Sequence, residues 1–216
     1  MIISIAVLVA LVAGYFYLPS ILGDSVLPLK YPDLIKKWSK AYNEDPYRIA
    51  ALLETESGFN PLAQSPVGAL GIGQVMPPTG RTIAQGVGMT DFTTSKLFDP
   101  DIGIQFATWQ VHVLMQKYNG NEVAALAAYN AGTGNADKWL RSGLLQSQSS
   151  NSYANRVMNY EAAYHKLYQS QLDLSAPVVA PTPIVMTVTN TQTRNVIWGQ
   201  ALKNLVSVFY GTGNNQ

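Results

Sequence analysis

The stretch Glu54-Thr-Glu-Ser-Gly-Phe-Asn-Pro61 places two carboxylates two residues apart at the end of an apolar run. Upstream of it, Asp45 is a good helix N-cap, and the proline that follows suits the first helical position. Downstream, Gly58 and the Asn-Pro pair favour a helix end. We therefore predict a helix from about residue 46 to about residue 57, with both glutamates in its last turn.

The two glutamates point in different directions on such a helix. Residues two apart are separated by about 200° around the helix axis, so Glu54 and Glu56 cannot share a small site. The apolar stripe formed by Ile49, Leu52 and Leu53 leads into Glu56, whereas Glu54 is expected on a solvated face. Burial raises the pKa of a carboxyl group toward values useful for a general acid, which makes Glu56 the candidate. Position alone also fits a helix-end glutamate that turns to solvent.

Composition excludes several classes of function. The 216 residues include 14 Lys and Arg against 13 Asp and Glu, and this near-neutral balance gives no electrostatic reason to expect a nucleic-acid partner. The absence of cysteine excludes thiolate metal sites, cysteine nucleophiles and disulfides. His112 and His165 are far apart in the sequence and outside any His-Glu-x-x-His pattern, so we expect ordinary roles for both. No metal ion and no cofactor is predicted.

The first 22 residues contain no charged side chain and approach the roughly 20 apolar residues that a membrane-spanning helix needs. Aromatic residues at positions 15–17 stand where an interfacial belt is expected. The alternative is a cleaved signal peptide, but no Lys or Arg precedes the apolar run and no small-x-small cleavage site follows it. We predict an uncleaved transmembrane anchor over residues 1–22.

Between residues 23 and 170 the sequence is mainly helical in character. Residues 23–44 are expected to form a linker and an amphipathic helix, and residues 62–100 a loop region with a short helix around 79–85. An Asp-Pro pair at 99–100 favours a long helix to about residue 118, whose apolar face we assign to Ile102, Phe106, Trp109 and Val113. Further helices are predicted over 122–130 and 153–169. No stretch alternates convincingly as a strand.

The C-terminal part differs in composition. Residues 170–195 contain three prolines among Val, Thr and Ala, which is typical of an extended linker. The tail at 196–216 returns to apolar residues at near-helical spacing, and it suits docking onto its own domain, a partner or a membrane surface.

A series of motifs marks a resemblance to a known family. They are Glu56-Ser-Gly-Phe-Asn-Pro61, Ser65-Pro-Val-Gly-Ala69, Gly71-Ile-Gly-Gln-Val-Met-Pro77 and Ala127-Ala-Tyr-Asn-Ala-Gly-Thr-Gly134. Four blocks in this order and spacing resemble the soluble-type lytic transglycosylases, and the resemblance covers roughly residues 45 to 168. It implies a mainly α, goose-type lysozyme-like helical domain over residues 45–169. The N-terminal transmembrane helix and the Pro-rich C-terminal extension lie outside the resemblance.

The resemblance also implies roles for individual residues. Glu56 matches the family's single catalytic acid. The other matching positions are expected to bind substrate: Ser65, Gln74 and Met76 along the sugar-binding groove, Tyr129 and Asn130 on a facing helix, and Tyr153 in the last motif. This chain departs from the family at Ser149, where a glutamate is frequent, at Gly103, where an asparagine is usual, and at Gly80, where an alanine is usual.

The chemistry that the resemblance implies is cleavage of the β-1,4 bond between N-acetylmuramic acid and N-acetylglucosamine in peptidoglycan. The sequence offers no obvious second carboxylate, since Asp91, Asp99, Asp101 and Glu122 lie in loop or capping contexts. In the family the muramic acid assists: its 2-acetamido group stabilises the cation-like intermediate, and its 6-hydroxyl attacks C1 to give a 1,6-anhydro product. Glu56 would then act first as acid and afterwards as base.

Two alternatives remain open at this point. One is a lysozyme-type hydrolase on the same fold, and the other is a weakly active wall-binding component of a virion or an envelope-spanning machine. The expected partners are peptidoglycan strands, a membrane through the N-terminal helix, and a phage particle or a secretion or conjugation complex. The expected location is a single-pass membrane protein with its catalytic domain facing the wall in the periplasm, or the internal membrane of a phage virion. Lysines at 30, 36, 37 and 40 follow the anchor and mildly favour the opposite orientation, but they count for less within a folded helix.

Overall fold

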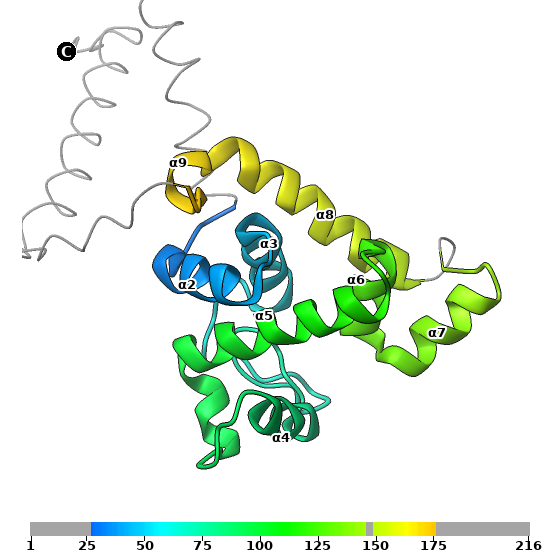
Figure 1. Cartoon of the computed structure of the whole chain (residues 1–216), viewed down its shortest axis with the longest axis horizontal. Helices are drawn as coiled ribbons and strands as arrows, with labels where there is room; N and C mark the ends of the chain where they lie inside the picture. The colour runs from blue at the N-terminus through cyan, green and yellow to red at the C-terminus, as the bar shows by residue number, and fades with distance from the viewer. Residues whose placement is uncertain (1–26, 146–148, 176–216) are drawn as a thin grey trace, which may run out of the picture. The chain divides into compact units, whose positions relative to one another are not determined.

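The computed structural model describes residues 27–145 and 149–175 of the chain (Figure 1). These residues form helices α2 (Pro32–Tyr42), α3 (Pro46–Ser57), α4 (Pro77–Gly86), α5 (Pro100–Lys117), α6 (Glu122–Ala131), α7 (Thr133–Arg141), α8 (Ser149–Leu167) and α9 (Gln169–Leu172), with a short 3₁₀ helix η1 (Thr94–Phe98). The described part of the chain has no β-strand, only isolated bridges joining Leu70 to Gln64 and Val75. The prediction of a mainly α domain is confirmed.

Helix α3 begins and ends where the sequence predicts. The Asp45 carboxylate accepts a hydrogen bond from the backbone N–H of Tyr47 at 2.8 Å, which satisfies one of the free donors of the first turn. At the other end Gly58 adopts a left-handed conformation with φ of 58°, which a residue without a β-carbon adopts at little cost. Local sequence is therefore sufficient to define this helix.

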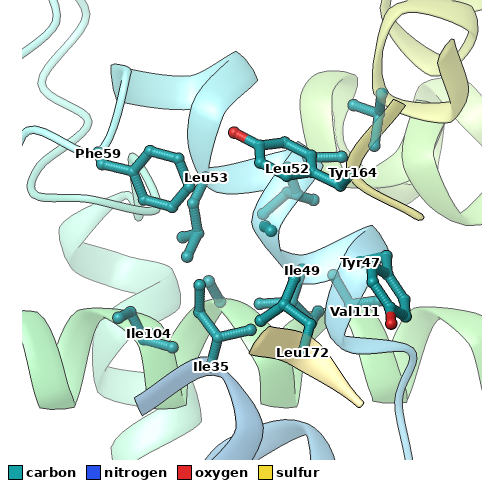
Figure 2. Close-up of a cluster of buried hydrophobic side chains, with 14 of the residues drawn as sticks. Ile35, Tyr47, Ile49, Leu52, Leu53, Phe59, Ile104, Val111, Tyr164 and Leu172 are labelled. Atoms are coloured by element: carbon teal, nitrogen blue, oxygen red, sulfur yellow. The ribbon is translucent and has the colours of Figure 1, made fainter. Parts of the chain in front are cut away.

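Helix α3 is surrounded by other helices. It packs against α2, α5 and α8, and Figure 2 shows Ile49, Leu52 and Leu53 among side chains that the neighbouring elements contribute. Ala50 and Ala51, on the face that was expected to be solvated, are fully buried as well. The prediction for Glu54 was therefore wrong: its side chain is partly buried, and its Oε2 atom has no hydrogen-bond partner among the described residues. A helix that is apolar on all sides is a core helix.

Helix α5 is likewise apolar on two sides. It lies between α2, α3 and α6 on one side and α4 with η1 on the other (Figure 1). Ile104, Ala107 and Val111 enter the core around α3, a face that the sequence analysis did not assign. Phe106 packs with the residues of α4, while Trp109 lies at its edge. The predicted apolar face is thus the side toward α4, and a second face was missed because neighbours cover both.

The packed core extends beyond the predicted boundaries at residues 45 and 169. The stripe of α2 is buried through Ile35, and α9 buries Leu172. Ahead of α2, Leu27 is buried and its carbonyl accepts a hydrogen bond from the Tyr168 hydroxyl at 2.9 Å. An amphipathic helix needs a partner for its apolar stripe, and here that partner is the domain itself.

Several helices differ from their predictions. Helix α4 is longer than the short helix expected around 79–85, α8 occupies residues 149–167 rather than 153–169, and α7 and α9 were not predicted. The helix that precedes α7 was expected over 122–130, and Gly132 ends it, with φ of 81°. The chain then starts α7 at the next residue, which propensity alone does not indicate.

The two glycine departures from the family have packing explanations. A β-carbon at Gly103 would lie 2.8 Å from the Ile72 side chain, and one at Gly80 would lie 2.9 Å from Phe92. Both distances are shorter than side chains tolerate without movement, so these positions allow α5 and α4 to approach their neighbours closely.

Within the described residues, no helix has the length and apolar character needed to cross a membrane. The anchor predicted at residues 1–22 lies outside them, as do most of the predicted linker at 170–195 and the tail at 196–216.

Candidate active site

Glu56 lies in the last turn of α3, with its carboxylate toward α8. The Tyr153 hydroxyl of α8 donates a hydrogen bond to Glu56 Oε1. Burial raises the pKa of Glu56 from 4.5 to about 7, although the Tyr153 hydroxyl and the positive charge of Arg156 act in the opposite direction. Glu56 therefore holds its proton up to neutral pH and can still release it, which is the property that a general acid and base requires.

Two tyrosines surround this carboxyl group. Tyr153 is buried on α8, and Tyr129 lies near the end of α6 with its hydroxyl donating to the Gly73 carbonyl at 2.7 Å. Burial, and then the negative charge of Glu56, raise the pKa of both phenols well above 10. Both hydroxyls therefore remain protonated donors throughout the range in which Glu56 titrates.

Side chains of two helices, α3 and α6, hold the loop between Gly71 and Val75 by hydrogen bonds. From α3, the Ser57 hydroxyl donates to the Ile72 carbonyl at 2.7 Å, and from α6 Tyr129 holds the next carbonyl. A β-carbon at Gly73 would lie only 2.7 Å from that of Ala107, so the loop passes directly over α5. The position of this loop is consequently set by the same helices that carry Glu56 and Tyr129.

A groove of about 700 Å³ adjoins this arrangement. It is lined by α4, α5, the end of α6 and the start of α7, and among its residues are Gln74, Met76, Tyr129 and Asn130. Tyr129 belongs both to the groove and to the surroundings of Glu56. Four of the predicted substrate-binding residues thus lie along one concave surface, and Tyr153 lies at Glu56.

Ser65 and Gln74 have internal contacts that the sequence analysis did not foresee. The Ser65 hydroxyl accepts a hydrogen bond from the Ala69 N–H at 2.9 Å and closes its own turn, and Ser65 is not among the residues that line the groove. The Gln74 amide donates to the Gly71 carbonyl at 2.9 Å and to Ala63 at 3.3 Å. The Gln74 nitrogen therefore holds its loop, which leaves its carbonyl oxygen for a ligand.

Several residues of the site were missed. Trp109 and Val113 of α5 line the groove, although the sequence assigned them to the core, and Thr79 and Thr82 of α4 line it as well. Arg156 acts on Glu56 from the exposed side of α8. Its position three residues after Tyr153 places both on one helix face, and that spacing was available as a signal.

Among the described residues, the site has one carboxylate. The influences on the pKa of Glu56 are burial, Tyr153 and Arg156, and no described carboxylate is among them. Glu54, two residues away, instead lies near Lys30 and Tyr164. The arrangement can transfer one proton to and from a ligand in the groove, and it provides no second carboxylate as nucleophile or base.

Comparison with known proteins places this geometry in a family. The family described as the transglycosylase SLT domain matches residues 33–165. The chain belongs to this family. The match begins in α2 and ends within α8, so it covers most of the packed core but neither Leu27 nor Leu172.

Curated relatives of this SLT domain protein include two kinds of lytic murein transglycosylase. The soluble lytic murein transglycosylase of Escherichia coli K12 is 32% identical over 114 residues, which are 52% of this chain and 18% of the relative. The membrane-bound lytic murein transglycosylase C of Edwardsiella ictaluri is 36% identical over 114 residues, 49% of this chain and 32% of the relative. The chain thus spans about a third or less of the length of these relatives.

Solved structures of the SLT family have the same fold. The 70 kDa soluble lytic transglycosylase of Escherichia coli superposes with a TM-score of 0.64 and 26% identity, covering 71% of this chain and 27% of that one. An inactive mutant of the lytic transglycosylase Slt from Pseudomonas aeruginosa gives a TM-score of 0.63 and 27% identity, covering 67% of this chain and 25% of the other.

Proposed function

We propose that this SLT domain protein is a peptidoglycan lytic transglycosylase, a lyase that cleaves the β-1,4 bond between N-acetylmuramic acid and N-acetylglucosamine. The observation that carries the proposal is Glu56: among the described residues it is the single carboxyl group of the site, protonated up to about neutral pH, hydrogen-bonded by Tyr153 and adjacent to a groove of about 700 Å³. The names of the relatives, lytic murein transglycosylases, support the choice of substrate.

The reaction begins with proton transfer from Glu56 to the glycosidic oxygen of the leaving sugar. The bond between that oxygen and C1 breaks, and the 2-acetamido group of the muramic acid stabilises the resulting cation-like centre. Ionised Glu56 then accepts the proton of the 6-hydroxyl as this oxygen attacks C1, which regenerates the acid and forms the 1,6-anhydro product without water. No second carboxylate from the described residues acts on Glu56, and this is compatible with the route, because the substrate supplies both stabilisation and nucleophile.

The groove residues divide between polar and apolar contacts in this proposal. The Gln74 oxygen and the exposed Asn130 side chain are available for sugar hydroxyl and acetamide groups. Met76, 38% exposed, and Trp109 offer apolar surface to the ring faces. Tyr153 has the different task of orienting Glu56.

We further propose that residues 1–22 anchor the enzyme and that it opens the wall locally. The support is the charge-free apolar run, long enough to span a bilayer. Two membranes fit this arrangement: a cell membrane with the domain facing the wall in the periplasm, alone or within a secretion or conjugation complex, and the internal membrane of a phage virion. Fractionation of producing cells and of any particles they release, followed by carbonate extraction, distinguishes the two. Recovery in the carbonate supernatant would rule out the anchor.

The enzymatic part is tested by mass spectrometry of fragments released from purified peptidoglycan by the full chain in detergent. Anhydromuramyl products are expected from the wild type and from Glu54→Gln, a matched control two residues away on the same helix, but not from Glu56→Gln. Reducing-end products would instead identify a hydrolase. Binding to peptidoglycan without release of any fragment would favour the wall-binding structural role.

A further inference from the structure

A second cluster of chemically reactive side chains lies at the other end of the α3–α8 pair. Asp45, Glu161 and His165 bring their ligand atoms within 4.8 Å of one another. Glu161 and His165 are one turn apart on α8, so their side chains lie on the same helix face. Asp45 is the N-cap of α3. Two carboxylates and one imidazole thus meet where the start of one helix passes the end of another.

Neighbouring groups already orient two of these side chains. Asp45 Oδ1 accepts the backbone N–H of Tyr47, while Oδ2 lies 3.4 Å from His165 Nε2. The His165 ring stacks on the Tyr47 ring with a centroid separation of 3.7 Å, and the Tyr47 hydroxyl is held by the Gln169 carbonyl at 3.1 Å. Hydrogen bonds and packing of this kind orient the ligands of protein metal sites.

The spacing fits a small tetrahedral ion. Zinc bonded to nitrogen and oxygen at about 2.0–2.1 Å has ligand atoms about 3.3 Å apart. The Asp45–His165 distance of 3.4 Å is close to this value, and the Glu161 carboxylate oxygen lies within 4.8 Å of both other ligand atoms. His165 is half-exposed, so a water molecule has access to a fourth position.

Carboxyl groups outnumber guanidinium groups around the cluster. Arg48 is the cation at its base and contacts Glu44 at 3.5 Å, Glu122 at 3.0 Å and Glu161 at 3.4 Å. Asp45 is a fourth carboxylate facing the same guanidinium group. Arg48 opposes a cation next to Glu161, but one positive charge does not balance four carboxylates.

We propose that Asp45, Glu161 and His165 bind a divalent transition-metal ion of the Zn²⁺ class. An imidazole with two carboxylates favours such an ion over Mg²⁺ and Ca²⁺, which prefer oxygen ligands alone. The site lies about 16 Å along α3 from Glu56, so the role is structural. The ion links the start of α3 to the end of α8. Glu56 and Tyr153 lie at the opposite ends of these two helices.

The test is calorimetric titration of the full chain, without an added histidine tag, with Zn²⁺ and separately with Mg²⁺. One Zn²⁺ per chain is expected to bind, with no saturable Mg²⁺ binding. At about one hundred times the Kd, Zn²⁺ should raise the Tm by about 5 °C or more, and EDTA should reverse the shift.

The chain offers matched variants. Asp45→Asn keeps a good N-cap but removes the anionic ligand, and His165→Gln removes the imidazole; each is expected to weaken Zn²⁺ binding at least tenfold. His112→Gln is the control, because His112 is the chain's other histidine and both its ring nitrogens are already engaged, by Glu44 at 3.2 Å and Gln116 at 3.0 Å. Its Zn²⁺ affinity should equal that of the wild type.

Absence of saturable Zn²⁺ binding by the wild type would overturn the proposal, and so would binding that survives both Asp45→Asn and His165→Gln. If neither variant folds, NMR of the histidine ring nitrogens in the wild type provides the second measurement. Zn²⁺ should shift the signals of His165 and leave those of His112 in place, and the reverse result would also overturn the proposal. None of these readouts depends on activity toward peptidoglycan.

Discussion

Burial disfavours the ionised form of the Glu56 carboxyl group, and the pH dependence of activity should show this effect directly. Its pKa of about 7 means that the acid form declines above neutral pH. The rate of peptidoglycan cleavage by the full chain should therefore fall about tenfold per pH unit above pH 7. Initial rates measured between pH 5 and 9 provide the check. A rate that continues to rise up to pH 9 would contradict the role of Glu56 as the acid.

The same residue should affect stability, with a definite sign. Its folded pKa of about 7 exceeds the ordinary 4.5, so the folded state binds more protons than the unfolded state between these values, and stability falls as pH rises through this range. Glu56→Gln removes this dependence. At pH 8 the variant should be more stable than the wild type by about 2–3 kcal/mol, and near pH 4 the difference should vanish. Urea unfolding of both proteins at the two pH values measures the difference in unfolding free energy. The same difference at pH 4 and pH 8 would refute the raised pKa of Glu56.

Tyr153 positions Glu56 through one hydroxyl group, which Tyr153→Phe removes. Because that hydroxyl stabilises the ionised carboxylate, its loss should raise the pKa of Glu56 and move the alkaline limb of the pH–rate profile upward. The rate at pH 6 should fall about ten- to a hundredfold, because the acid is no longer held in place. Tyr160→Phe on the same helix is the control, and it should leave the alkaline limb and the rate at pH 6 unchanged. A rate loss without a shift of the limb would indicate a purely structural role.

At the scale of elements, the loop between Gly71 and Val75 contacts three helices, α3, α5 and α6, next to the site. Gly73→Ala places a methyl group against Ala107 and beneath the Tyr129 hydroxyl, 3.3 Å away. We expect a loss of about 1–3 kcal/mol in unfolding free energy, together with a loss of activity larger than the destabilisation explains. Gly134→Ala in α7 meets no atom within 4 Å and should be neutral or slightly stabilising. Thermal unfolding and cleavage rates of both variants test this, and equal effects would contradict it.

Element boundaries were predictable where a local signal decides them. Asp45 and Gly58 define α3, and Asp99 caps α5 through bonds to the N–H groups of the next turn. Where no local signal exists, the prediction failed: α7 follows a glycine that also ends α6, and one face of α5 was assigned where two are buried. Periodicity shows that a helix is apolar, but the number of neighbours around it depends on the whole fold.

At the scale of the whole molecule, the segment before α2 is part of the core. Leu27 is 5% exposed; its carbonyl accepts a hydrogen bond at 2.9 Å from Tyr168, the N-cap of α9, and the Pro28 carbonyl accepts one at 2.7 Å from Tyr164 of α8. Leu27→Ala in the full chain should lower the unfolding free energy by about 2–4 kcal/mol. Val67→Ala, at a side chain 77% exposed, should change it by less than about 0.5 kcal/mol. Similar urea midpoints for the two variants would show that this segment does not contribute.

By itself the sequence determined the helical class of the domain and the ends of α3, because helix caps and periodicity act over a few neighbouring residues; the choice of Glu56 over Glu54 rested on the family motif as well and stays a prediction. Only the tertiary structure decided that Glu54 is also partly buried, that Tyr153 contacts Glu56 across 97 positions, and that Ser65 bonds within its own turn and does not line the groove. The raised pKa of Glu56 belongs to the same category, since it depends on how completely α6, α8 and the 71–75 loop exclude water. Burial and electrostatic coupling are properties of packed neighbours, and those neighbours come from distant parts of the chain.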